Sequence, residues 1–185
     1  MLRHVWKFLR KPTYRSYSNA PIWYKRKIFF NLLGWNLLIG ITIALLNVQL
    51  ASSFGIDTGE HATEKLFKEF SLFTIFCIVV LFAPVVEELI FRGPLVFFRS
   101  SAYFNIAFYL SIIGFAAIHA SNFENMEEGL WLLPLLVAPQ FIMGIFLGYI
   151  RVTLGLSWSV LLHACHNGIL LTPVILSELL KIPSE

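Results

Sequence analysis

The sequence predicts an all-α protein, a polytopic transmembrane helix bundle of about five spans with a kinked second span. Of its 185 residues, 57% are hydrophobic and only 14% are charged, whereas about a quarter of a soluble domain is charged. The mean hydropathy is +0.73. Five long apolar runs approach the roughly 20 residues that a helix needs to cross a bilayer. A chain of this length is expected to form one domain.

The apolar runs define the expected spans. They cover residues 28–50, 70–86, 100–120, 130–150 and 156–176. The second run is interrupted by Glu87, Glu88 and Arg92 but continues apolar to Phe98. Proline removes a backbone donor and crowds the preceding turn, so Gly93-Pro94 predicts a kink in one long second helix.

Charge in the connections predicts the orientation. Eight lysines and arginines precede the first apolar run with no acid among them, while the 121–129 loop carries three glutamates and no base. Basic residues favour the cytoplasmic side, so we expect a cytoplasmic N-terminus in the cell membrane and a C-terminus on the far side. A basic arm can also bind nucleic acid, but beside a span it is expected to contact membrane lipid and no nucleic acid.

Ionisable side chains interrupt the apolar runs at three places. Each costs at least about 2.5 to 3.5 kcal/mol at membrane depth, so each requires a reason. In the first cluster Glu88 and Arg92 stand at i and i+4 and can pair, while Glu87 is rotated by about 100° and has no such local partner. His119 ends the third run, and His163 shares a helix face with Asn167 in the fifth.

Together the three clusters supply the groups for water attack on an amide. A carboxylate can act as general base, an imidazole can relay protons, and a histidine with an amide can stabilise an oxyanion. Each piece also has a structural interpretation. A lone intramembrane histidine or Asn167 can serve as an interhelical hydrogen-bonding group, and the Glu88–Arg92 pair alone is more typical of a structural role. We expect His4, His61 and His166 to be structural, and Gly144 and Gly148 to allow close helix packing.

The three clusters resemble the motifs of a known family. The CAAX-protease and bacteriocin-processing (CPBP, or Abi) intramembrane endopeptidases, relatives of the Ras-converting prenyl-protein endopeptidase, carry E-E-x-x-x-R, F-x-x-x-H and H-x-x-x-N/D in this order. The chain is similar in all three: Glu87-Glu88 with Arg92, Phe115 with His119, and His163 with Asn167. Ser157-Trp158-Ser159 also resembles the surroundings of the third motif.

The resemblance implies an all-helical membrane peptidase. Glu87 would act with His119 on a water, His163 and Asn167 would stabilise the oxyanion, and Glu88, Arg92 and Phe115 would support the site. The family has been described as metalloproteases, and a metal-free glutamate mechanism is also proposed for it. The cofactor is therefore either none or zinc, since Glu87, His119 and His163 also make a two-histidine, one-carboxylate set. Asn167, a poor zinc ligand, favours the metal-free alternative.

The organisation expected on this basis has four parts: a basic cytoplasmic arm (1–27), a first span with a surface loop (28–69), an intramembrane peptidase core (70–177) and a C-terminal tail (178–185). The substrate would be a peptide or small protein at the membrane, CAAX-type or leader-like. The alternatives are a non-catalytic immunity or peptide-binding protein of the same fold, and an ion-coupled transporter.

Residue counting sets a geometric condition on this site. At 1.5 Å per residue from the nearest turns, Glu87, His119 and His163 fall at unequal depths. A shared site therefore requires tilted spans, a break near Pro94, or turns placed elsewhere.

Overall fold

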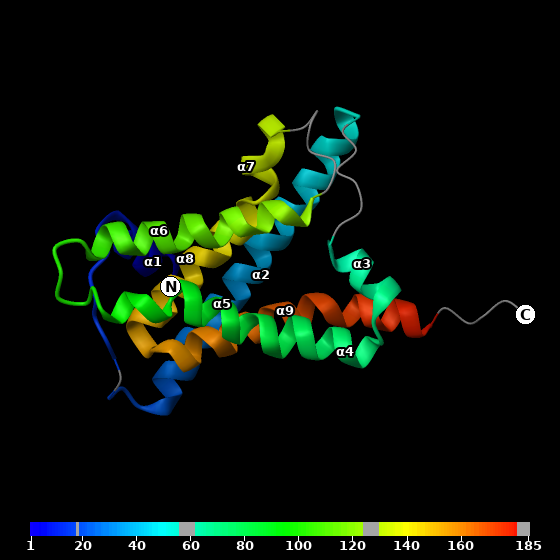
Figure 1. The fold of residues 1–185 in the computed structure, drawn as a ribbon. Helices are drawn as coiled ribbons and strands as arrows, with labels where there is room; N and C mark the ends of the chain where they lie inside the picture. The colour runs from blue at the N-terminus through cyan, green and yellow to red at the C-terminus, as the bar shows by residue number, and fades with distance from the viewer. Residues whose placement is uncertain (18, 56–61, 124–129, 181–185) are drawn as a thin grey trace, which may run out of the picture.

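A computed structural model describes residues 1–17, 19–55, 62–123 and 130–180, and within these ranges every regular element is helical (Figure 1). The α-helices are α1 (Leu2–Arg10), α2 (Ile22–Ser53), α3 (Ala62–Glu69), α4 (Leu72–Phe76), α5 (Ala83–Phe91), α6 (Phe104–Ile118), α7 (Leu133–Leu136), α8 (Ala138–Leu154) and α9 (Leu156–Leu179). A π-helical segment (Cys77–Phe82) joins α4 to α5, and 3₁₀ turns cover Gly93–Val96, His119–Asn122 and Leu130–Leu132.

Within the described ranges, four helical stretches are long and apolar enough to cross a membrane. They are Ile22–Ser53, Leu72–Val96, Phe104–Asn122 and Leu156–Leu179, and the shorter apolar helix α8 accompanies them. The prediction of an all-α polytopic bundle is confirmed. The chain is an integral membrane protein.

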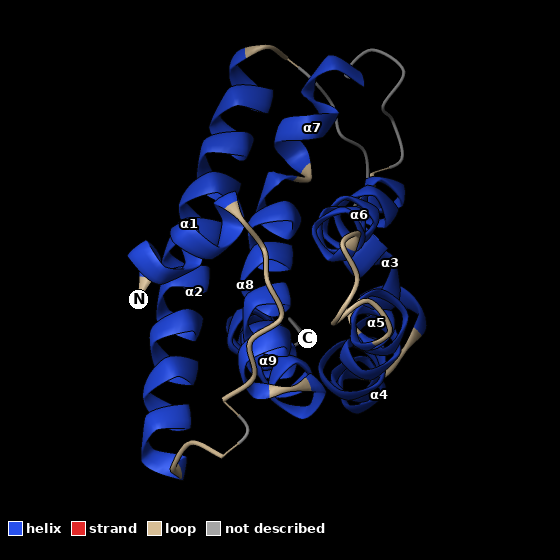
Figure 2. Cartoon of the chain, turned by 90° about the vertical axis from the view of Figure 1, so that its left-hand side faces the viewer, coloured by secondary structure: helices blue, strands red, loops and turns tan. Residues whose placement is uncertain are grey.

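Helix α8 lies at the centre of the bundle. It packs against α2, α6 and α9, and Figure 2 shows it between α2 and α6. Every residue from Met143 to Leu154 is buried, which is typical of a helix that is enclosed on all sides. Its neighbours carry the exposed hydrophobic side chains, as expected for lipid-facing surfaces.

The second span is kinked as predicted, because α5 ends at Phe91 and a 3₁₀ turn follows from Gly93. The π-helical segment at Cys77–Phe82 was not predicted, although Pro84 provides a signal for it. Proline has no N–H and its ring crowds the carbonyl four residues earlier. A wider turn relieves that conflict, and such turns are a known cause of helix bends.

The fourth expected span differs from the prediction. Residues 130–150 do not form one helix: a 3₁₀ turn and the short α7 come first, and α8 begins only at Ala138. Pro134 and Pro139 each lie at the start of a helix, where a missing N–H is tolerated. The two prolines therefore divide the apolar run, and α7 departs from the bundle in Figure 1.

The basic arm is more ordered than the sequence suggested. Residues Leu2–Arg10 form α1, whose Val5 is buried. The Phe8 ring meets the rings of Phe108 and Tyr149 edge-on, with centroids 5.0 and 5.3 Å apart. The Tyr109 hydroxyl donates a hydrogen bond to the Leu9 carbonyl. These contacts fix the arm to the end of α6 and α8.

The two glycines of the G-x-x-x-G pattern lie at the α6–α8 contact. A Cβ built on Gly148 would come within 2.6 Å of Phe108 Cε2, and one on Gly144 within 3.2 Å of Ile112 Cγ2. Phe108 is completely buried, so its ring has little room to move. The glycines therefore allow α6 and α8 to approach closely, as the pattern predicts.

We expect Gly148→Ala to destabilise the protein by about 1 to 3 kcal/mol, the usual cost of overpacking a core. Gly34→Ala is the matched control, since a Cβ there meets nothing within 4 Å, and it should leave stability unchanged or slightly higher. Thermal unfolding in detergent measures both. Equal melting temperatures for the two variants would contradict this packing.

Candidate active site

A buried carboxylate, Glu88, organises the centre of the bundle. Both it and Arg92 are completely buried, and Arg92 Nη1 lies 3.2 Å from Glu88 Oε1 within α5. The same Oε1 is 3.1 Å from His163 Nδ1 on α9, and the Ser159 hydroxyl donates to Oε2. The predicted pairing of Glu88 with Arg92 is therefore present, and it extends to α9.

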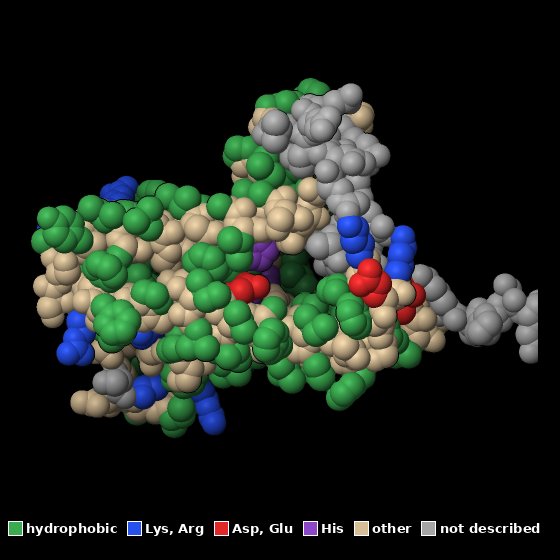
Figure 3. Space-filling model, in the orientation of Figure 1, with side chains coloured by type: hydrophobic (Ala, Val, Ile, Leu, Met, Phe, Trp, Pro, Cys, Tyr) green, Lys and Arg blue, Asp and Glu red, His purple; other side chains and the backbone are tan. Residues whose placement is uncertain are grey.

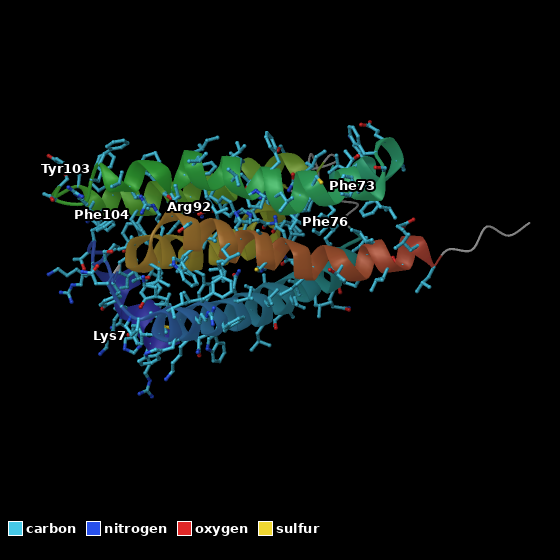
Figure 4. The ribbon with its side chains drawn as sticks, turned by 90° about the horizontal axis from the view of Figure 1, so that it is seen from below. Lys7, Phe73, Phe76, Arg92, Tyr103 and Phe104 are labelled. Carbon is cyan, nitrogen blue, oxygen red and sulfur yellow. The ribbon has the colours of Figure 1, made fainter. Side chains whose placement is uncertain are left out.

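Arg92 is enclosed by backbone and aromatic groups as well as by Glu88. Its Nη2 donates to the Gly144 carbonyl at 3.5 Å, and its guanidinium carbon lies 4.1 Å from the centre of the Phe115 ring. Figure 4 shows Arg92 inside the bundle, between the helices. A cation over an aromatic face is stabilised by the ring quadrupole, more so when both are away from water.

Glu87 lies on the other side of the same imidazole. Its Oε2 is 3.7 Å from His163 Nε2, and its side chain keeps 22% of its exposure. Among the described residues, Oε2 has no hydrogen-bond partner. Glu87 and Glu88 thus flank the two ring nitrogens of His163. Glu88 is fully enclosed, whereas Glu87 has an oxygen that accepts no hydrogen bond.

His119 joins this cluster through Phe115. Its Nδ1 is 2.7 Å from the Phe115 carbonyl one turn earlier, so Nε2 is the ring nitrogen left for other partners. The Phe115 ring lies 4.8 Å from the His119 ring and 5.7 Å from the His163 ring, centroid to centroid. Both imidazoles therefore contact one phenyl ring.

Asn167 contacts the π-helical segment rather than another side chain. There Ala83 N–H donates to Ile78 O, one residue further back than in an α-helix, which leaves Val79 O without its α-helical donor. The next candidate donor would be Pro84, which has no N–H. Asn167 Nδ2 supplies the missing bond to Val79 O at 2.9 Å. A buried carbonyl without a partner is costly, so one Asn167 proton is committed to this bond.

The geometric condition set by the sequence is met. The break after Arg92 and the wider π turn alter the course of the second span, and the structure brings Glu87, Glu88, Arg92, Phe115 and His163 into contact. His119 borders the cluster through Phe115, and Asn167 lies one turn beyond His163 against Val79. Figure 3 shows a hollow in this face, between α6 and α4–α5, with acidic and histidine side chains at it and hydrophobic side chains around it.

Two supporting residues were not identified from the sequence as part of the site. Ser159 is completely buried and holds both Glu88 and the Leu147 carbonyl. Arg151 donates from Nε to the Arg92 carbonyl at 3.0 Å and from Nη1 to the Tyr14 hydroxyl at 3.2 Å. Its position in the last turn of an apolar run was the available signal, because a buried arginine needs acceptors.

Of the remaining histidines, the two that the structure describes lie outside the cluster. His166 Nδ1 is 3.0 Å from Asn36 Nδ2 on α2, which is the structural, interhelical role expected of it. His4 is exposed on α1. His61 lies outside the described residues.

The comparison with known families bears directly on these motifs. The model of the type II CAAX prenyl endopeptidase Rce1-like family matches residues 69–169, more than half of the chain, and this stretch contains all three motifs. The chain belongs to this family. The resemblance found from the motifs is thereby confirmed. A search of curated proteins and a search of solved structures each gave no match.

The fit of a metal ion to this Rce1-like protein can be tested on its side chains. Among the described residues, no group of three or more histidine, cysteine, aspartate or glutamate side chains is arranged to hold a metal ion. The suggested zinc set of Glu87, His119 and His163 is therefore not supported by the arrangement of the described side chains.

Proposed function

We propose that this protein is an intramembrane endopeptidase in which Glu87 activates a water for attack on a peptide bond of a membrane-associated substrate. The observation that carries the proposal is the difference between the surroundings of two adjacent carboxylates, Glu87 and Glu88. Glu88 is enclosed and fully used by Arg92, His163 and Ser159, whereas the Glu87 side chain is partly exposed and its Oε2 has no hydrogen-bond donor among the described residues. A carboxylate with free acceptor capacity is what a general base requires.

His119 is the proposed second member of the water site. Its Nδ1 is occupied by the Phe115 carbonyl, which fixes the ring and makes Nε2 the acceptor of the neutral form. Nε2 can then accept a hydrogen bond from the water that Glu87 deprotonates, take that proton from Glu87, and pass it to the leaving amine nitrogen as the C–N bond breaks. The bond between His119 and its own helix orients the ring before substrate binds.

His163 and Asn167 are the proposed stabilisers of the tetrahedral oxyanion. His163 Nδ1 faces the Glu88 carboxylate, so donation from Nε2 requires the protonated ring. Asn167 uses one amide proton on Val79 O and has a second to offer. Donors placed where charge develops contribute the largest single share of many rate enhancements.

The setting favours a substrate that is itself in the membrane. The cluster borders a hollow surrounded by hydrophobic side chains (Figure 3), and exposed apolar residues such as Phe73, Phe76 and Leu110 cover the outer faces of α4 and α6. CAAX-type and leader-like peptides both meet this condition, and we propose this class without choosing between them.

A cleavage assay with His119→Ala tests the proposal. The full chain in liposomes is given membrane-anchored CAAX-type and leader-like peptides, and we expect the variant to cleave at least about a hundredfold more slowly, the usual contribution of a proton-transfer group. His4→Ala is the matched control because His4 is exposed on α1, and it should cleave at the wild-type rate.

Retained cleavage in His119→Ala would remove His119 from the mechanism. Absence of cleavage in the wild type for every peptide, together with binding that the variant preserves, would instead support the alternative of a non-catalytic peptide-binding protein of the same fold.

A further inference from the structure

A cavity of about 480 Å³ lies at the end of the bundle that carries the basic arm. Residues 10–14, from the last residue of α1 onward, form one wall, and residues 99–102 with the first residues of α6 form the other. Tyr109 lies at its edge, where it also binds the Leu9 carbonyl. Figure 4 shows Tyr103 and Phe104 at the same end of the molecule as Lys7.

The side chains that line this cavity suit an anion. Three are cations, Arg10, Lys11 and Arg99, and among the described lining residues none is acidic. Hydroxyl groups of Thr13, Ser100 and Ser101 add hydrogen-bond donors. Helix α6 begins at Phe104 with no side-chain cap, so the positive end of its dipole also faces this region. Cations and hydroxyls around one cavity match the charge and acceptors of a phosphate group.

The surroundings place the cavity at the level of lipid headgroups. Trp6, Phe97 and Tyr103 are all more than half exposed at this end of the bundle, and aromatic side chains concentrate at the membrane–water interface. Next to the cavity, Ile106, Leu110 and Ile113 form an exposed apolar stripe along α6. A molecule with an anionic head and apolar tails would therefore meet charge in the cavity and hydrocarbon contacts along α6.

We propose that this cavity binds the phosphate-bearing headgroup of an anionic phospholipid, whose acyl chains lie along α6. Basic pockets between helices at a membrane surface are known to bind such headgroups. The bound lipid joins the arm to the α5–α6 connection. Tyr14, which lines the cavity, also accepts a hydrogen bond from Arg151 Nη1, and Arg151 Nε donates to the Arg92 carbonyl at the end of α5. The cavity is therefore next to a residue that supports the first motif, but it contains no residue of that motif.

Lipid titration of the full chain tests the proposal. The chain is purified in a neutral detergent, and bound phosphatidylglycerol and phosphatidylcholine are counted by native mass spectrometry. We expect preferential retention of one phosphatidylglycerol. The triple variant Arg10→Gln, Lys11→Gln, Arg99→Gln should bind it about a hundredfold more weakly, since each cation near an anionic surface contributes roughly a fivefold factor. Arg99→Lys should retain most of the affinity.

A second triple variant distinguishes lipid binding at this cavity from general electrostatic attraction between the basic arm and anionic lipid. Arg3→Gln, Lys7→Gln, Arg15→Gln removes the same charge from exposed positions outside the cavity and should keep the bound lipid. Equal loss in both triple variants, or no preference for phosphatidylglycerol over phosphatidylcholine, would overturn the proposal.

Inorganic phosphate alone should not raise the melting temperature as the lipid does. An equal rise would assign the cavity to free phosphate instead. All variants should unfold at the wild-type temperature in phosphatidylcholine, because the altered side chains are exposed.

Discussion

Glu87→Gln is expected to lower kcat by about a thousandfold while KM changes little. Glutamine keeps the size of the side chain and its ability to accept a hydrogen bond, but it cannot take a proton from water. A general base contributes about a hundredfold to ten-thousandfold to a rate, and because it acts in the transition state its loss appears in kcat. Steady-state cleavage of a membrane-anchored peptide in liposomes measures both constants.

Two comparisons make this prediction specific. Glu69→Gln is the matched control, since Glu69 is exposed at the end of α3, and it should behave as the wild type. The melting temperature of Glu87→Gln should stay close to wild type as well, because Glu87 has no hydrogen-bond partner at Oε2 to lose. Full activity in Glu87→Gln would eliminate the base mechanism proposed for this residue.

Arg92→Met is expected to destabilise the protein by about 3 to 5 kcal/mol. The change removes the cation 3.2 Å from Glu88 and leaves a completely buried carboxylate with less compensation. Breaking one side of a buried ion pair costs more than the pair itself contributes, because the remaining charge stays out of water. Thermal unfolding in detergent, at a fixed protein concentration, measures the effect.

The double variant Glu88→Leu, Arg92→Met separates charge from packing. With both charges gone, we expect most of the lost stability to return, since replacing a buried pair with apolar groups is often neutral. Activity should remain low, because His163 Nδ1 and the Ser159 hydroxyl lose the acceptor that orients them. A double variant as unstable as Arg92→Met would show that the lost packing of the guanidinium, not its charge, supports this part of the bundle.

The fold class and the pairing of Glu88 with Arg92 could be predicted from the sequence because both are local. Hydropathy over about 20 residues defines a span, and i,i+4 spacing defines a pair. The contacts that create the site are not local. One ring nitrogen of His163 faces Glu87 and the other faces Glu88. This arrangement depends on the rotation of α9 against α5, which no single motif specifies.

The break in the fourth span and the π-helical segment have a common cause that the sequence does contain. Pro84, Pro134 and Pro139 each remove a backbone donor, and hydropathy averaged over a window does not register a missing N–H. The bond from Asn167 to Val79 shows why this matters, since it satisfies a carbonyl that the proline and the wider turn leave without a donor.

The i,i+4 spacing of Glu88 and Arg92 also has a consequence for biosynthesis. A ribosome delivers the second span to the bilayer before α9 exists, so neither His163 nor Ser159 can yet compensate Glu88. On insertion scales each isolated charge would oppose partitioning by about 2.5 to 3.5 kcal/mol. Since the partner cation lies on the same helix, one turn away, the Glu88–Arg92 pair can enter the lipid as a nearly neutral unit. The cluster around Glu88 is then completed only when α9 arrives.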